Sequence, residues 1–299
     1  MNHDNKHCFR IETRNYKNSM FSYSVDATYI LHLENNGRLP AINKQLEEFK
    51  PTNTVHLVFN KGFKNCEKLL KEQTPQYDIV DTNFYILQHA NEKGYNNILI
   101  LEDDFIFSQE IYNKDHLKNI NEFLINNKNE KLMYYLGCLP NISIPYNSFT
   151  YRLLFSGGAH CIFYTYNARK ILLEKPENHK NIYDWDQYIN KAFYIKRLVY
   201  YIPLCYQLIP QTENKKYWSQ SYISYLREPI TLTIDSFIKY NKLDVQPEPG
   251  YGNAYFFGKI IGILIIVFMI VLIALLLMFL WLLIKKYNVY KKLRKFKLQ

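Results

Sequence analysis

A long uncharged apolar segment near the C-terminus constrains this chain more than any other feature. It runs from Ile260 to Ile284 and reads IIGILIIVFMIVLIALLLMFLWLLI. At about 1.5 Å per residue, a helix of this length exceeds the roughly 30 Å hydrocarbon core of a bilayer. A buried helix of a large core seldom runs this long without a polar face. The segment therefore predicts one tilted transmembrane helix, with Trp281, Lys285 and Lys286 as interfacial anchors near one end.

Two signals disagree on the side of the membrane that the preceding domain faces. Residues 1–25 carry charges throughout and contain no apolar stretch of the kind that a secretory signal needs, which favours a tail anchor with the domain in the cytosol. The positive-inside rule favours the opposite orientation, because seven basic residues follow the span: Lys285, Lys286, Lys291, Lys292, Arg294, Lys295 and Lys297. We give the missing signal more weight. A glycan on Asn141, in the sequon Asn141-Ile142-Ser143, would overturn that choice.

The basic balance of the chain resides mainly in this tail. The formal net charge is +10, and the tail supplies +7 of it, which leaves +3 for everything before Lys285. A basic cluster next to a membrane span favours anionic lipid headgroups. No stretch before it resembles a basic groove with regularly placed aromatic residues. We therefore expect membrane lipid, and no nucleic acid, as the partner of these charges.

The spacing of the cysteines does not indicate a disulfide framework. They are widely separated, odd in number and form no C-x-x-C pair: Cys8, Cys66, Cys138, Cys161 and Cys205. Neither a zinc site nor a set of disulfides is indicated by this spacing. We expect reduced, partly buried thiols, as in a cytosol-facing domain, with two bridges plus one free thiol as the alternative.

Strand-like and helix-like segments alternate before the span. We expect strands at 27–33, 54–59, 97–101, 132–136 and 159–164, and helices at 41–49, 82–93, 109–127, 167–173 and 184–193. The run NILIL at 97–101 is apolar without interruption, as a strand covered on both faces needs. This order predicts an α/β fold with an open, mainly parallel sheet and helices on both faces.

The chain length before the predicted span allows one large domain or two small ones, and we favour one. We expect an N-terminal extension at 1–25, a catalytic domain at 26–240, a linker at 241–259, the transmembrane helix at 260–284 and a basic tail at 285–299. The linker is indicated by Pro247, Pro249 and Gly250.

Three acids follow the most apolar strand directly. In an extended chain alternate side chains share a face, so Glu102 and Asp104 point together and Asp103 points away. Ligands of open α/β sheets lie beyond the carboxyl ends of the strands, and carboxylates there commonly hold a hard divalent cation. A solvated acidic turn that caps the next helix is the alternative. Because a buried strand leads directly into the three acids, we favour the metal site.

Several segments in a fixed order resemble family 25 of the glycosyltransferases, which contains the lipooligosaccharide and procollagen galactosyltransferases. ILILEDDFIF resembles its metal-site strand, ATYILHLENNGR its opening strand and Arg-containing turn, KLMYYLGCLP the strand after the metal site, and GGAHCIFYTYNARKIL a strand-to-helix unit. DWDQYI and PLCYQLIPQTENKKYW resemble the acceptor-side and terminal segments of more distant members. Together these pieces cover Ala27 to Trp218. The chain departs from the bacterial members before the metal strand, where it carries Gln88-His89 instead of a Cys-x-x-Ser-His-like stretch.

The resemblance implies a Rossmann-like, GT-A type fold that acts on a nucleotide diphosphate sugar with Mn²⁺ or Mg²⁺. Asp104, supported by Glu102, would bind the cation, and Asp103 would contact ribose or donor-sugar hydroxyls. Arg38 would meet the diphosphate or the uracil side, or else it is a surface residue of a polar turn. A cation on the diphosphate lowers the barrier as negative charge builds on the departing group. The transferred sugar would be galactose or glucose and the acceptor a glycan or a protein.

The resemblance also implies transfer with inversion, which needs a general base for the acceptor hydroxyl. Asp184 and Asp186 flank Trp185 at the start of a helix; Asp184 suits the helix cap, which leaves Asp186 as the base. Trp185 is either a platform for a sugar face or a core residue. Further candidates for acceptor or donor contacts, each with an equally plausible structural role, are His160, Gln207, Glu213, Asn214 and Trp218.

Three function classes compete. A membrane-anchored hexosyltransferase leads. A metal-dependent phosphohydrolase could use the same acids, since carboxylate clusters also suit two-metal chemistry. The third class is a non-catalytic membrane protein with a degenerate transferase fold.

Overall fold

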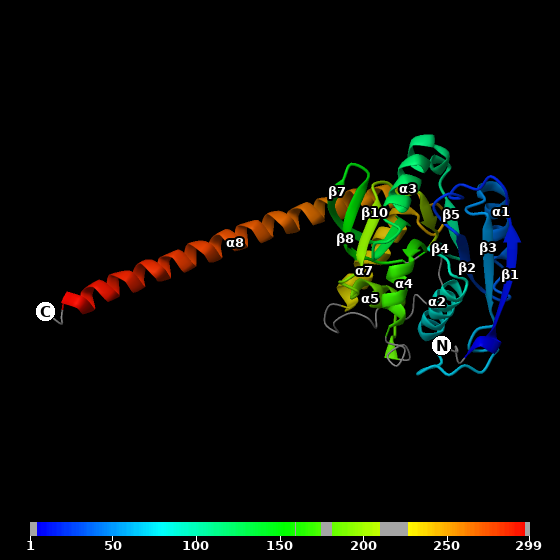
Figure 1. Cartoon of the computed structure of the whole chain (residues 1–299), viewed down its shortest axis with the longest axis horizontal. Helices are drawn as coiled ribbons and strands as arrows, with labels where there is room; N and C mark the ends of the chain where they lie inside the picture. Colours follow the sequence, from blue (N-terminus) through cyan, green and yellow to red (C-terminus); the bar gives the residue numbers. More distant parts are fainter. Residues whose placement is uncertain (1–4, 159, 175–180, 210–226, 297–299) are drawn as a thin grey trace.

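The computed structural model describes residues 5–158, 160–174, 181–209 and 227–296 of the chain. They form an α/β domain from which one long helix projects (Figure 1). The strands of its main sheet are β1 Phe9–Asn15, β2 Ala27–Leu33, β3 Thr54–Asn60, β4 Asn97–Glu102, β6 Leu132–Gly137, β7 Asn141–Asn147, β8 Thr150–Ser156, β9 Cys161–Thr165 and β10 Lys196–Tyr200. A separate two-stranded sheet pairs β5 Phe105–Phe107 with β11 Cys205–Gln207.

The expectation of a mainly parallel sheet is wrong, because the main sheet is mixed. Its strand order is β1-β3-β2-β4-β9-β6-β10-β8-β7. β3, β2 and β4 are parallel, as are β6 and β10, whereas β9 lies antiparallel between β4 and β6. The β7–β8 hairpin extends the sheet at one edge and β1 at the other, both in antiparallel pairing. Only β7 and β8 pair through a hairpin; the partners β1 and β3, β8 and β10, and β4 and β9 are distant in the sequence.

Helices cover both faces of the sheet, as the sequence predicted. They are α1 Leu39–Phe49, α2 Pro75–Glu92, α3 Lys114–Asn126, α4 Tyr166–Leu173, α5 Trp185–Asn190, α7 Arg227–Asn241 and α8 Gly250–Phe296. Successive residues of β4 face opposite layers: Ile98 and Ile100 belong to the cluster with α2, α4 and α5, and Leu99 and Leu101 to the cluster with α1 and α3. The apolar run NILIL is therefore buried on both sides.

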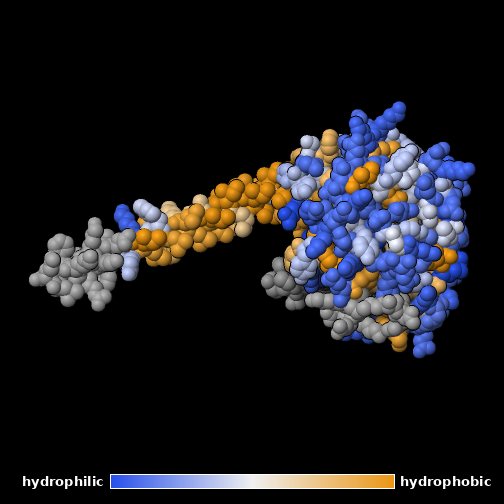
Figure 2. All heavy atoms as spheres, viewed as in Figure 1, coloured by the Kyte–Doolittle hydropathy of each residue, from blue (hydrophilic) through white to orange (hydrophobic). Residues whose placement is uncertain are grey.

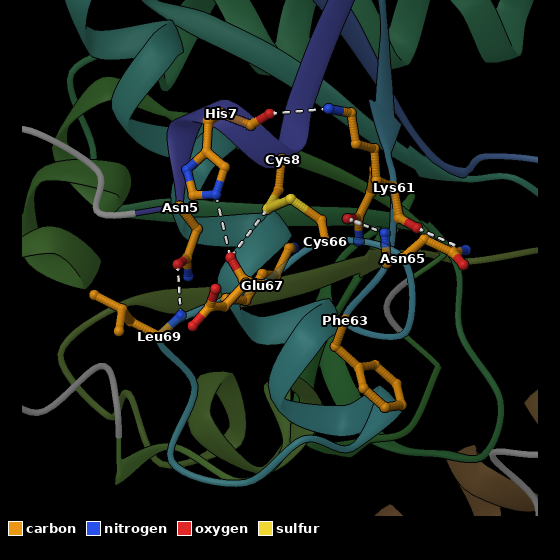
Figure 3. Close-up of a disulfide and its surroundings, with 12 residues drawn as sticks. Asn5, His7, Cys8, Lys61, Phe63, Asn65, Cys66, Glu67 and Leu69 are labelled. Carbon is orange, nitrogen blue, oxygen red and sulfur yellow. Dashed lines mark hydrogen bonds between the residues drawn. A yellow bond between two sulfur atoms is a disulfide. The ribbon is translucent and has the colours of Figure 1, made fainter.

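The N-terminal segment belongs to the domain, although we expected an extension at 1–25. β1 pairs with β3 along its whole length, from Phe9 opposite Asn60 to Asn15 opposite Thr54. A disulfide joins Cys8, just before β1, to Cys66 in the loop after β3 (Figure 3). The expectation of reduced thiols is thus wrong for this pair, while Cys138, Cys161 and Cys205 are free and buried. Spacing alone could not pair Cys8 with Cys66, because their proximity depends on the β1–β3 register.

α8 leaves the domain as an apolar rod (Figure 2). Among the described residues, α8 is the one helix that is long and apolar enough to cross a membrane, and the candidate span is its part Gly250–Tyr287. The helix begins within the segment expected to be a linker at 241–259. Tyr251 and Tyr255 are buried in the domain core, so the first turns of α8 are part of the domain.

Two glycines, one helical turn apart, allow α8 to lie against β7. They are Gly258 and Gly262. A Cβ atom on Gly258 would lie 2.1 Å from the Asn141 carbonyl oxygen, and one on Gly262 would lie 2.1 Å from that of Ser143. A G-x-x-x-G pair in an apolar helix usually serves helix pairing. Here the same small face packs against a strand.

We predict that Gly258→Ala destabilises the domain. The added methyl group meets backbone and cannot be relieved by a rotamer change, so overpacking should cost about 1–3 kcal/mol, or about 2–4 °C of melting temperature per kcal/mol. Gly252→Ala is the matched control, because Gly252 is exposed and its Cβ would meet only the Glu248 side chain, at 3.1 Å. Thermal unfolding of the full chain in detergent micelles measures both. Equal melting temperatures for the two variants would contradict the docking of α8 on β7.

Candidate active site

The acids predicted from the sequence lie where β4 ends. β4 finishes at Glu102, Asp103 and Asp104 form a turn, and β5 begins at Phe105. β4 lies beside β2 in parallel register, so the turn at the end of β2 comes next to the acids. This places Arg38, at the start of α1, within reach of the acidic turn.

Asp103 fixes the turn that follows β2. Its Oδ2 accepts hydrogen bonds from the Leu33 backbone N–H at 3.3 Å and from the Asn36 side chain, and lies 3.4 Å from His32 Nδ1. Its Oδ1 accepts from Arg38 Nη1 at 2.5 Å. Burial disfavours the charged form, but these partners hold the pKa of Asp103 below its ordinary value. Oδ1 thus contacts Arg38, and Oδ2 contacts the turn between β2 and α1. A contact between Asp103 and donor hydroxyls stays a prediction.

Glu102 and Asp104 converge on one side chain, as the strand alternation predicted. Gln207 Nε2 donates to Glu102 Oε2 at 3.0 Å and to Asp104 Oδ1 at 2.9 Å. Asp104 Oδ2 also accepts from Arg38 Nη1 at 3.0 Å. The carboxamide of Gln207 therefore occupies a position between two carboxylates.

Gln207 reaches the acids through local pairing of two short strands. It is the last residue of β11, opposite Phe105 of β5, and β5 starts directly after Asp104. Its backbone N–H donates to the Tyr251 hydroxyl at 2.9 Å, and that hydroxyl donates to the Gln207 carbonyl at 3.1 Å. Tyr251 belongs to the first turn of α8, so the long apolar helix holds the backbone of this site residue.

A glycine allows β11 to approach the main sheet. A Cβ atom on Gly137, at the end of β6, would lie 1.8 Å from the Cys205 carbonyl oxygen. A larger residue would displace β11 and move Gln207 away from the acids. Sequence reasoning treated Gln207 as part of a polar loop, since nothing local to 205–207 indicates its partner strand.

Negative charge is poorly balanced at this site. Burial, followed by repulsion from Asp104, Asp186 and Asp103, raises the pKa of Glu102 well above its ordinary value. Burial also raises the pKa of Asp104, although Arg38 and Gln207 oppose the shift. The guanidinium of Arg38 contacts two of these carboxylates, those of Asp103 and Asp104.

The two aspartates at the start of α5 have different roles. Asp184 is the N-cap and accepts from the Gln187 backbone N–H at 2.8 Å, which confirms its expected capping role. Asp186 Oδ2 accepts from the Gly158 backbone N–H at 2.8 Å. Asp186 is close enough to raise the pKa of Glu102, so α5 brings a fourth carboxylate toward the acidic turn.

Two other candidates are buried side chains. His160 is fully buried; its carbonyl accepts from the Glu102 backbone N–H at 3.1 Å and its Nε2 lies 3.3 Å from the Cys205 carbonyl oxygen. Burial lowers the pKa of His160 to about 4, so the ring is neutral near pH 7. Trp185 is a core residue, packed edge-on against Phe84. Neither side chain is open to a ligand. Glu213, Asn214 and Trp218 lie outside the described residues.

The acidic turn fits a divalent cation by its chemistry. Mg²⁺ and related hard cations take carboxylate and amide oxygens. Two carboxylates already converge on one carboxamide, and a half-turn of the Gln207 side chain would present Oε1 in place of Nε2 as a third oxygen. Among the described residues, the three ligand-type side chains whose ligand atoms all lie within 4.8 Å of one another are His7, Cys8 and Cys66. That group does not fit a thiolate metal site, because its two sulfurs are bonded to each other.

Comparison with known proteins gives partial likenesses. No protein-family model matches the chain. Over 83 residues it is 32% identical to a tRNA (guanine-N(7)-)-methyltransferase from Clostridium tetani (strain Massachusetts / E88), which covers 26% of this chain and 39% of that enzyme. The chain thus spans about two fifths of the length of that relative.

Two solved structures show a loose likeness to the fold. One is a glycosyltransferase involved in the glycosylation of the major capsid of PBCV-1, with a TM-score of 0.35, 15% identity, and coverage of 59% of this chain and 84% of that one. The other is an apo UDP-glucose pyrophosphorylase, with a TM-score of 0.32, 11% identity, and coverage of 58% and 72%. Superpositions this loose do not establish a shared activity, so the chemistry of the site carries the functional argument.

We predict that Glu102→Gln stabilises the metal-free protein at pH 7. The folded-state pKa of Glu102 is raised, so its ionisation disfavours the folded state above the unfolded-state pKa. Glutamine removes that cost, and a gain of about 1 kcal/mol would raise the melting temperature by about 2–4 °C. The gain should disappear near pH 4, where wild-type Glu102 is protonated in the folded state. Thermal unfolding with a chelator present at both pH values measures it, and a destabilised variant at pH 7 would contradict the charge imbalance.

Proposed function

We propose that the protein is a membrane-anchored glycosyltransferase that uses a divalent cation to transfer a hexose, galactose or glucose, from a nucleotide diphosphate sugar to a glycan or protein acceptor, with inversion. The observation that carries this proposal is the convergence of Glu102 and Asp104 on one point beside Arg38. An under-compensated acidic site suits a cation, and the adjacent guanidinium suits the phosphate groups that the cation would share.

Each residue then has a defined task. Glu102 and Asp104, with Gln207 Oε1, would hold Mn²⁺ or Mg²⁺, which when bound stabilises negative charge on the diphosphate. Arg38, whose side chain is 32% exposed, would donate to diphosphate oxygens while Asp103 keeps it in place. Asp186 would take the proton of the acceptor hydroxyl as the oxygen attacks the anomeric carbon and the bond from sugar to diphosphate breaks. The hydrogen bond from Gly158 holds the Asp186 carboxylate in place.

The same assays distinguish the proposed activity from two alternatives. A phosphohydrolase would release phosphate from simple phosphoesters, and a degenerate transferase fold would bind no nucleotide sugar. The likeness to the tRNA methyltransferase covers too little of that enzyme to support methyl transfer here. A screen of nucleotide diphosphate sugars with manganese, read as hydrolysis or transfer, separates these classes.

We predict that Asp186→Asn lowers kcat by about 10²–10⁴-fold with little change in stability, because it removes a general base and keeps a side chain that can accept from Gly158. Asp184→Asn is the matched control, since asparagine caps helices as well as aspartate does. Nucleotide-sugar turnover and thermal unfolding are measured for both. Equal activity of the two variants would refute the assignment of Asp186.

The cation site has its own variant pair. Asp104→Ala should abolish metal-dependent turnover without unfolding the domain, whereas Asp244→Ala, which removes an exposed aspartate remote in sequence from the site, should leave turnover unchanged. Full activity of Asp104→Ala would reject Asp104 as a metal ligand.

The disulfide changes the proposal for membrane sidedness. Disulfides persist in oxidising compartments and are rare in the cytosol. The Cys8–Cys66 bond and the basic tail therefore agree on a domain outside the cytosol, and together they outweigh the charged start of the chain. Asn141 is 3% exposed and lies against α8, so an empty sequon would not speak against this orientation.

We predict that, in sealed vesicles with the cytosolic face outward, a membrane-impermeant maleimide labels Tyr287→Cys and not Tyr23→Cys. Both positions are exposed, at 65% and 89%, and they lie on opposite sides of the apolar span. Detergent should make Tyr23→Cys reactive. Labelling of Tyr23→Cys in sealed vesicles, with Tyr287→Cys protected, would place the domain in the cytosol instead.

A further inference from the structure

Aromatic residues surround the point where α8 leaves the domain. Lys259 is the last charged residue before the apolar span, and its Nζ donates to the Tyr201 carbonyl at 2.6 Å. The same ammonium lies 4.6 Å from the centroid of the Tyr151 ring. Tyr201 in turn packs against Phe149, with ring centroids 6.2 Å apart. The tip of the β7–β8 hairpin is thus tied to the first residues of the span.

Large apolar side chains of this region are left exposed. Tyr146 is 47% exposed, Phe149 44%, Leu154 40% and Phe155 43%, all on the β7–β8 hairpin. Phe256 and Phe257, on the turn of α8 just before the span, are 61% and 54% exposed. A patch of this kind marks a contact with a partner or a membrane.

The contact between α8 and β7 indicates that the partner of this apolar patch is the membrane. Gly262 lies inside the apolar segment, yet it packs against Ser143 and Ile144 of β7. The apolar length beyond this contact, from Ile263 to Ile284, corresponds to about 33 Å at 1.5 Å per residue, close to the roughly 30 Å hydrocarbon core. If α8 crosses the membrane, the hairpin beside Gly262 lies at the depth of the headgroups.

We infer that the β7–β8 hairpin, together with Phe256 and Phe257, forms a membrane-facing surface that inserts into the headgroup layer of the bilayer that α8 spans. Aromatic rings and snorkelling lysines favour this layer, where one end of the side chain meets apolar surface and the other meets water. Trp281 with Lys285, whose ammonium lies 5.2 Å from the indole ring centroid, forms the equivalent pair at the other end of the span. The surface adds a second attachment to the anchor and fixes the orientation of the domain relative to the membrane.

The test uses the full chain in lipid nanodiscs with an environment-sensitive fluorophore on single introduced cysteines. The free native cysteines are buried, and Cys8 and Cys66 are bonded to each other, so labelling is directed to Phe149→Cys or Phe155→Cys. Tyr23→Cys, exposed at a position remote from the hairpin in sequence, is the solvent control, and Leu276→Cys within α8 reports on the span itself. All four positions are exposed, so the variants keep the core intact.

We expect the probes at Phe149 and Phe155 to emit at shorter wavelength than the probe at Tyr23. They should lose most of their intensity when the nanodisc contains a lipid with a nitroxide near the headgroup. Short-wavelength emission at Leu276, near the middle of the span, but water-like and unquenched emission at Phe149 and Phe155, would overturn the membrane-facing surface and leave the span intact. Water-like emission at Leu276 would overturn the membrane span and the surface with it.

Discussion

Repulsion among carboxylates at the end of the central strand is the constraint around which this domain is built. Glu102, Asp103 and Asp104 follow a strand buried on both faces, and Asp186 approaches from α5. Arg38 compensates part of this charge, and the carboxamide of Gln207 bridges two of the acids. Clusters of this kind lower stability and persist at functional sites because a ligand offsets their cost. The remaining positive charge is what a divalent cation would supply.

The long apolar helix α8 is structurally continuous with this site. Its first turns lie in the domain core, Tyr251 hydrogen-bonds both backbone groups of Gln207, and Gly258 and Gly262 pack against β7. α8 is therefore part of the domain and also holds a residue of the candidate metal site. A fragment that ends at residue 255 would lose the packing of Gly258 and Gly262, so biochemical work calls for the full chain.

Features set by local pattern were predictable from the sequence, and features set by distant pairing were not. Apolar runs located β2, β3, β4, β6 and β9, and with β4 the acidic turn that follows it. A strand that is buried on both faces leaves such an uninterrupted run in the sequence. The antiparallel insertion of β9 between β4 and β6 has no local signal, since the same apolar run suits either direction. Gln207 lies about a hundred residues from Glu102, and only the pairing of β11 with β5 brings them together. The Cys8–Cys66 bond depends in the same way on the β1–β3 register.

Direct titration of the full chain with Mn²⁺, followed by calorimetry and by the electron paramagnetic resonance signal of free Mn²⁺, tests the central claim that the acids at the end of β4 form a cation site. We predict one saturable site per chain that is lost in Glu102→Gln and Asp104→Ala, weakened in Gln207→Ala, and required for binding of a nucleoside diphosphate. Undiminished Mn²⁺ binding by Asp104→Ala, or diphosphate binding of equal strength with a chelator present, would contradict it.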